Sequence, residues 1–94
     1  MPTYRKKPVQ IEAFQMTEER RTTNVDWPDW LHDAWNMEPG KSGALYCKDG
    51  GDDLFIGTLE GEHHVTWGDF IIQGVQGEIY PCKPDIFAAT YDVI

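Results

Sequence analysis

Basic side chains become rare after the first 21 residues of this 94-residue sequence. Residues 22–94 carry three Lys or Arg against thirteen Asp or Glu, a balance of −10, whereas residues 1–21 have a balance of +2. An acidic surface repels the phosphates of DNA and RNA, so we expect no direct nucleic-acid binding and favour partners with a basic surface. The alternative is that the charge only keeps a small protein soluble.

Long apolar segments are also missing from the sequence. No stretch approaches the roughly 20 consecutive apolar residues that a membrane-spanning helix needs, and the N-terminal segment lacks the apolar run of a signal peptide. We therefore expect a protein of the cytosol that makes no contact with a membrane.

Cysteine is scarce, and the patterns typical of metal sites and catalysis are weak. Cys47 and Cys82 have neither the number nor the spacing of a disulfide framework, so we expect two packed thiols. A nucleophilic Cys82 would need a nearby base and a lowered pKa; Lys83 is adjacent, but the rigid frame of Pro81 and Pro84 favours packing at a bend of the chain. His63 and His64 are adjacent in a predicted strand, where their side chains point to opposite faces and do not easily share an ion. The acidic cluster within residues 49–53 lacks the alternating ligands of a calcium loop. The sequence predicts no metal, no cofactor and no enzyme activity.

The strongest local signal is a helix that begins near Asp26 and ends close to Pro39. Asp26 is a favourable cap, and Pro28 suits the first turn. An apolar stripe follows at helical spacing: Trp27, Trp30, Leu31, Ala34 and Trp35. We expect this stripe to pack across a sheet, because buried aromatic side chains dominate small cores.

Short strands separated by tight turns account for most of the remaining chain. In the first strand Val9, Ile11 and Ala13 are expected to face the core, and the polar segment 17–24 is expected to be a loop. A turn that ends with Gly77 at positive φ is predicted before the sixth strand. The expected strands are 9–13, 45–47, 54–59, 62–66, 70–72 and 78–80.

Proline marks the C-terminal end of this strand series. Pro81 and Pro84 argue against a central strand, and Asp85 is expected to cap a short helical turn, after which residues 91–94 add an edge strand. The sequence thus predicts an α+β fold in a single domain, residues 1–94. It consists of a small antiparallel sheet of about five to six short strands, either open or closed like a barrel, with one amphipathic helix packed on it and a short C-terminal helical turn.

Segments at both ends of the chain carry a family resemblance. They are Tyr4–Val9 with Ile11–Gln15, Thr58–Gly61, Gly68–Ile72, Gly74-Val75, Gly77-Glu78 and Tyr80–Phe87 with Thr90-Tyr91. On these motifs the sequence resembles a widespread family of small phage and prophage proteins. The resemblance implies an accessory protein that works in the cytosol of a bacterial host, and it implies no particular biochemical activity.

The leading hypothesis is a phage-encoded, non-enzymatic protein that binds a host protein and inhibits an anti-phage defence system. An acidic surface can occupy a basic nucleic-acid channel by placing carboxylates where phosphates would lie. The densest acidic group in predicted turns is expected to make the contact: Asp49, Asp52, Asp53, Glu60 and Glu62.

Two other functions remain open at this point. One is a small-ligand protein that binds a nucleotide signal between Trp30 and the basic residues Arg5, Lys6 and Lys7, because aromatic rings stack on bases and basic groups hold phosphate. The other is a minor virion or assembly factor. An edge strand and surplus aromatic residues would also allow a homodimer.

Overall fold

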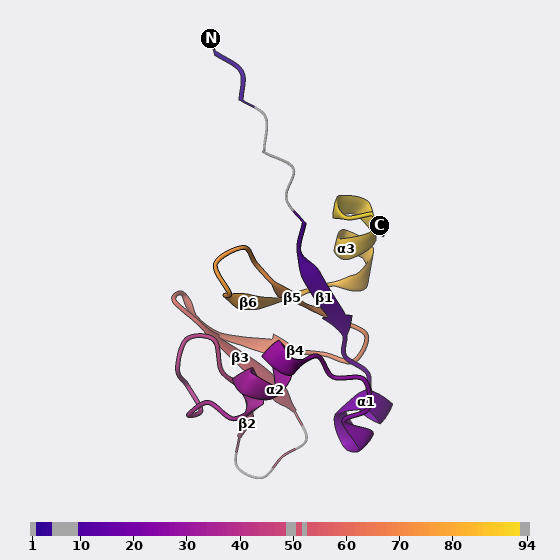
Figure 1. Ribbon diagram of the computed structural model, residues 1–94, viewed down its shortest axis with the longest axis vertical. Coiled ribbons are helices and arrows are strands. Elements are labelled where there is room, and N and C mark those ends of the chain that lie inside the picture. Colours follow the sequence, from indigo (N-terminus) through magenta and orange to yellow (C-terminus); the bar gives the residue numbers. More distant parts are fainter. Residues whose placement is uncertain (1, 5–9, 49–50, 52, 93–94) are drawn as a thin grey trace.

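The computed structural model describes residues 2–4, 10–48, 51 and 53–92 (Figure 1). Its strands and helices follow one another as β1 (Glu12–Gln15), α1 (Glu18–Thr23), α2 (Asp29–Trp35), β2 (Leu45–Cys47), β3 (Leu54–Thr58), β4 (Gly61–Val65), β5 (Phe70–Gln73), β6 (Ile79–Cys82) and α3 (Pro84–Thr90). The α+β class and about six antiparallel strands are confirmed.

The strands form two antiparallel sheets, with strand orders β1-β5-β6 and β2-β3-β4. The expectation of a single sheet is therefore wrong, and so is its barrel-like variant, because the described strands do not close. The turn between β4 and β5 separates the sheets: Gly68 donates its N–H to the carbonyl of Met16, and Met16 donates to the carbonyl of Asp69. These bonds attach the turn to the end of β1, so that β5 continues beside β1 instead of beside β4.

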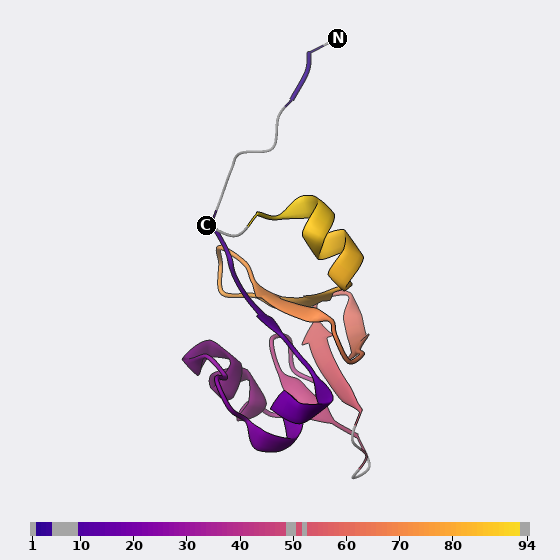
Figure 2. The ribbon, with the colours of Figure 1, turned by 90° about the vertical axis from the view of Figure 1, so that its right-hand side faces the viewer.

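One hydrophobic cluster joins both sheets and α2. It contains Phe14, Met16, Trp27, Leu31, Ala34, Leu45, Leu54, Ile56, Val65, Ile71 and Ile79, with Trp30, Trp35 and Cys47 partly buried against it. Figures 1 and 2 show α2 on one face of the β2-β3-β4 sheet and α3 at the far end of the molecule, beside β5 and β6. The predicted apolar stripe is confirmed as a packing surface. Each fully buried side chain of this kind contributes roughly 1.5–3 kcal/mol.

Helix α3 covers the face of the β1-β5-β6 sheet that points away from the core. Along β5, Ile71 faces the core, so its neighbour Phe70 faces the opposite side, where its ring stacks on Phe87 of α3 at 4.0 Å between centroids. The helix begins at Pro84 and runs to Thr90, longer than the predicted single turn, and its N-cap is Lys83 rather than Asp85. β6 also runs through Pro81 to Cys82, which a proline permits because β6 is an edge strand.

Strand β1 has the opposite phase to the one predicted. Phe14 and Met16 are buried, whereas Ala13 is exposed and Ile11 is half-buried; Val9 lies outside the described residues. The two larger side chains occupy the core, and the bonds of Met16 to the β4–β5 turn fix this register. A shift of one residue in a strand exchanges its faces, which is why Ala13 lies opposite to its expected side.

The segment predicted as a loop contains helix α1, Glu18–Thr23. Thr17 caps it by accepting the N–H of Arg20 on its hydroxyl, and Asn24 ends it in the left-handed conformation. No residue of α1 is buried, so no apolar periodicity could announce it. Asp26 has a positive φ of 64° and does not cap α2, which begins after Pro28.

The turns are close to their predicted places. Gly77 has a positive φ of 84°, as expected. In the β3–β4 hairpin Thr58 pairs with Gly61, so the turn consists of Leu59 and Glu60, one residue earlier than predicted. Tyr91 and Asp92 form no strand, and the last two residues of the expected edge strand lie outside the described residues.

Candidate functional site

Carboxylates dominate the surface of the part of the chain that the structure describes. Every Asp and Glu in residues 2–4, 10–48, 51 and 53–92 is exposed except Asp69, which is only 2% exposed. Asp69 accepts the N–H of Thr66 at 2.9 Å and the ammonium of Lys83 at 3.3 Å, so its charge is used inside the fold. The other carboxylates are directed to solvent.

The described basic side chains, by contrast, all have partners within the molecule. The guanidinium of Arg20 lies over the ring of Phe14, and that of Arg21 lies over the ring of Trp35, at 4.9 and 4.6 Å from the ring centroids. The three described lysines form ion pairs, in the combinations Lys41 with Glu38, Lys48 with Glu62, and Lys83 with Asp69. The described lysines and arginines therefore interact with groups of the same molecule, and the rest of the described surface remains negative.

The described members of the predicted acidic group lie apart from one another. Asp49 and Asp52 lie outside the described residues. Asp53 precedes β3 and Glu60 follows it, so they occupy opposite ends of that strand. The Asp53 carboxylate lies 3.7 Å from the imidazole of His64.

Glu62 is a structural carboxylate rather than a free one. It pairs with Lys48 and accepts the hydroxyl of Tyr46 at 2.6 Å. The hydrogen bonds from Lys48 and Tyr46 lower the pKa of Glu62, while burial and the same carboxylate raise the pKa of Tyr46 to about 12. A partner would have to break these bonds to use Glu62.

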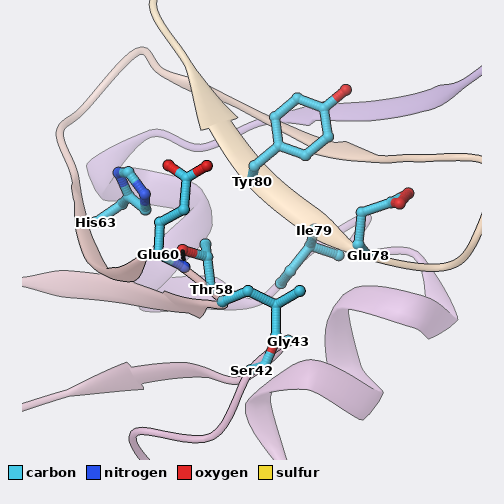
Figure 3. Close-up of a pocket in the computed structure, with 9 residues that line it drawn as sticks. Ser42, Gly43, Thr58, Glu60, His63, Glu78, Ile79 and Tyr80 are labelled. Atoms are coloured by element: carbon cyan, nitrogen blue, oxygen red, sulfur yellow. Dashed lines mark hydrogen bonds between the residues drawn. The ribbon is translucent and has the colours of Figure 1, made fainter.

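A pocket of about 340 Å³ lies where the tip of the β3–β4 hairpin meets the start of β6. Its lining comes from four segments and consists of Ser42, Gly43, Thr58, Leu59, Glu60, His63, Glu78, Ile79 and Tyr80. Figure 3 shows Glu60 and His63 on one side of the opening and Glu78 and Tyr80 on the other. Of the predicted site residues that the structure describes, only Glu60 belongs to this pocket.

The two carboxylates of this pocket, Glu60 and Glu78, differ in how firmly they are held. Glu78 accepts the N–H of Gln76 at 3.2 Å on one oxygen. Glu60 has no side-chain hydrogen bond among the described residues, and neither glutamate is in an ion pair with a described residue. Glu60 can therefore accept hydrogen bonds from a visiting cation at little cost to the fold, whereas the carboxylate of Glu78 lies against Gly74 in the β5–β6 turn.

Tyr80 forms an ordered wall of the pocket. Its hydroxyl is hydrogen-bonded to the side chain of Tyr91, and in Figure 3 it points away from the other labelled residues. Burial is the first cause that raises the pKa of Tyr80 to about 12, followed by Tyr91 and Glu78. The ring, and not the hydroxyl, therefore lines the pocket.

The aromatic stripe, part of which was predicted to bind a ligand, is packed against the core. Trp27 is buried, donates its indole N–H to the carbonyl of Arg20 at 2.9 Å, and meets Trp35 edge to face at 6.1 Å. Trp30 is half-buried against the core. The basic residues that would hold a phosphate, Arg5, Lys6 and Lys7, lie outside the described residues.

The described histidines and cysteines do not gather into a metal site. No group of three or more His, Cys, Asp or Glu side chains in the described ranges is placed to hold an ion. His64 stacks on Phe55 at 5.0 Å, whereas His63 faces the pocket. Cys82 is half-buried, and burial, Asp69 and Asp85 together raise the pKa of its thiol, which reduces the thiolate available for nucleophilic attack.

Within the described residues, none of the helices has the length and apolar character needed to cross a bilayer. Comparison with known proteins found no matching family model, no matching curated protein and no matching solved structure. The function proposed below therefore rests on the contacts and charges of this chain alone.

Sequence reasoning missed most of the pocket. The sequence places Glu78 and Tyr80 in the predicted strand 78–80 and gives no signal at Ser42 and Gly43. They meet Glu60 because two hairpins from different sheets come together, and no local pattern in the sequence encodes that contact. The one available signal was the acidic residue at each hairpin turn, Glu60 and Glu78.

Proposed function

We propose that this protein acts by stoichiometric binding of a basic partner protein through its carboxylate surface, and that it performs no catalysis. The observation that carries the proposal is the division of charge: each described lysine and arginine has a partner within the molecule, while most of the exposed carboxylates have no basic partner among the described residues. This division leaves the surface poor in free cations and rich in acceptors for a partner's basic groups.

Such a surface has a clear physical use. Carboxylates compete with phosphates for the Lys and Arg side chains of a nucleic-acid channel, and complementary potentials raise the rate of encounter. The resemblance of both ends of the chain to small phage proteins favours a host protein as the partner. A nucleic-acid-dependent defence system of the bacterial host fits this chemistry best.

The experiment is capture of host proteins on the tagged full chain, at low and at physiological salt. The acidic variant combines Asp53→Asn with Glu60→Gln, which removes two exposed charges and leaves the Glu62 bonds to Lys48 and Tyr46 intact. We expect the acidic variant to recover less partner, and the loss to be larger at physiological salt, where screening weakens the remaining charges.

The matched control combines Asp26→Asn with Asp33→Asn, which removes the same charge from two exposed positions in and beside α2. Asn tolerates the positive φ of residue 26, so the change should leave the fold intact. Equal recovery of the same partner by the wild type and both variants, at either salt concentration, would refute an acidic interface.

A further inference from the structure

The pocket between the β3–β4 hairpin and β6 combines negative charge, an aromatic wall and an apolar floor in one small space. Its volume of about 340 Å³ lies at the lower end of the roughly 300–1,000 Å³ range of small-molecule pockets. That volume suits one long side chain or a small fragment.

We propose that this pocket receives a single arginine side chain of the partner protein. The idea rests on the proposed function and adds to it the contact point and the chemistry of the partner. Glu60 and Glu78 line opposite sides of the pocket (Figure 3). Glu60 accepts hydrogen bonds from the guanidinium, and Glu78, whose carboxylate lies against Gly74 in the β5–β6 turn, adds negative charge.

The flat wall of Tyr80 favours a guanidinium over an ammonium group. A guanidinium is planar, stacks on aromatic faces and forms paired hydrogen bonds with carboxylates, whereas an ammonium is a compact and strongly hydrated charge. The Tyr80 hydroxyl points away from the other labelled residues in Figure 3, so the ring is the part of Tyr80 that faces the pocket.

The remaining lining suits the apolar stem of an arginine. Ile79 is buried in the core cluster, and Leu59 in the hairpin turn is 96% exposed. An arginine buries its methylene groups along such surfaces while its charged end stays with polar partners. A partner that inserts an arginine would also cover Leu59.

Other occupants fit the pocket less well. A phosphate group would meet two glutamates, and no lysine or arginine of the described residues lines the pocket. A metal ion would need more ligands than the described carboxylates and His63 bring together. The charge of the lining thus selects an organic cation.

The test is an NMR titration of the isotope-labelled full chain with a capped tripeptide whose central residue is arginine. The matched peptide carries citrulline, which has the shape of arginine without its charge. We expect the arginine peptide to move the amide signals of Gly43, Glu60 and Tyr80, and the citrulline peptide to bind at least about tenfold more weakly, because charge-assisted hydrogen bonds are roughly twice as strong as neutral ones. A lysine peptide should be weaker than the arginine peptide.

Two double variants distinguish arginine binding in the pocket from general attraction to the negative surface. Glu60→Gln with Glu78→Gln should weaken arginine binding by at least about tenfold, whereas Asp26→Asn with Asp33→Asn should change it by less than about threefold. Glu60→Gln alone is the safeguard if the double change loosens the β5–β6 turn, because it disturbs no described side-chain hydrogen bond.

Four results would overturn the inference: no shifts with the arginine peptide, shifts outside the pocket, equal binding of arginine to citrulline or lysine, or equal losses in both double variants. The proposed function fails separately, since it requires only that partner capture depends on salt and on exposed carboxylates. Salt-sensitive capture with no arginine-specific shifts would thus refute the pocket and leave the acidic interface standing.

Discussion

Replacing Asp69 with alanine should destabilise the protein more than any other single change of an acidic residue. Its carboxylate accepts the N–H of Thr66 at 2.9 Å and the ammonium of Lys83 at 3.3 Å, and its backbone carbonyl accepts the N–H of Met16. The side chain thus stabilises the turn that joins the two sheets and links it to the residue that caps α3. With alanine, the Thr66 N–H loses its acceptor in a half-buried place.

The expected loss follows from the two bonds. An unsatisfied donor costs about 1–3 kcal/mol, and the ion pair adds less than about 1 kcal/mol because the Lys83 side chain is 53% exposed. We expect Asp69→Ala to lower the free energy of unfolding by about 2–3 kcal/mol, Asp69→Asn by about 1 kcal/mol, and Lys83→Met by less than about 1 kcal/mol.

Urea denaturation followed by circular dichroism measures these differences. With a slope near 1 kcal/mol per M for a chain of this size, Asp69→Ala should lower the midpoint by about 2 M. A shift below about 0.5 M, or an equal shift for Lys83→Met, would refute the assignment of Asp69 as the acceptor that holds the turn.

Three further predictions concern the hairpin sheet and the tyrosines. Because the pKa of Glu62 is lowered, its bonds stabilise the fold above its ordinary pKa of 4.5, and this stabilisation is lost as the pH falls through the lower pKa of the folded state. Glu62→Gln should therefore reduce the dependence of the free energy of unfolding on pH in the acid range, and the same pH dependence in both proteins would contradict this. Ultraviolet titration should show Tyr46 and Tyr80 ionising at about pH 12, and Tyr46→Phe should remove one of these late transitions; an unchanged late transition would contradict the assignment. A Cβ at Gly57 would collide with the backbone carbonyl of Lys41 in the loop before β2. Gly57→Ala should therefore lower the free energy of unfolding by about 1–3 kcal/mol, measured by thermal denaturation, and an unchanged melting temperature would show that the loop moves aside without cost.

Local patterns predicted the elements that depend on neighbouring residues. The strand at Leu45–Cys47 has its predicted bounds, and the turn at Gly77 has the positive φ that its glycine suggested. The stripe that begins at Trp27 is packed on the core because its helical spacing places the aromatic side chains on one face. In each case the signal lies within a few residues of the structure that it describes.

The errors concern features that distant contacts or caps decide. The phase of β1 depends on bonds between Met16 and the β4–β5 turn, and α1 depends on the cap at Thr17 instead of on apolar periodicity. The division into two sheets and the meeting of Glu60 with Glu78 follow from the same long-range arrangement. A pattern of alternating residues carries no information about which strands become neighbours.

The most direct test of the acidic-surface account is the affinity of the captured host protein for this chain as a function of salt, measured by titration calorimetry. The account predicts that the affinity falls at least about tenfold between about 0.05 M and about 0.5 M NaCl, because exposed charges are screened over this range. An affinity that stays constant across the same range would show that apolar contacts hold the complex and that the exposed carboxylates are not its interface.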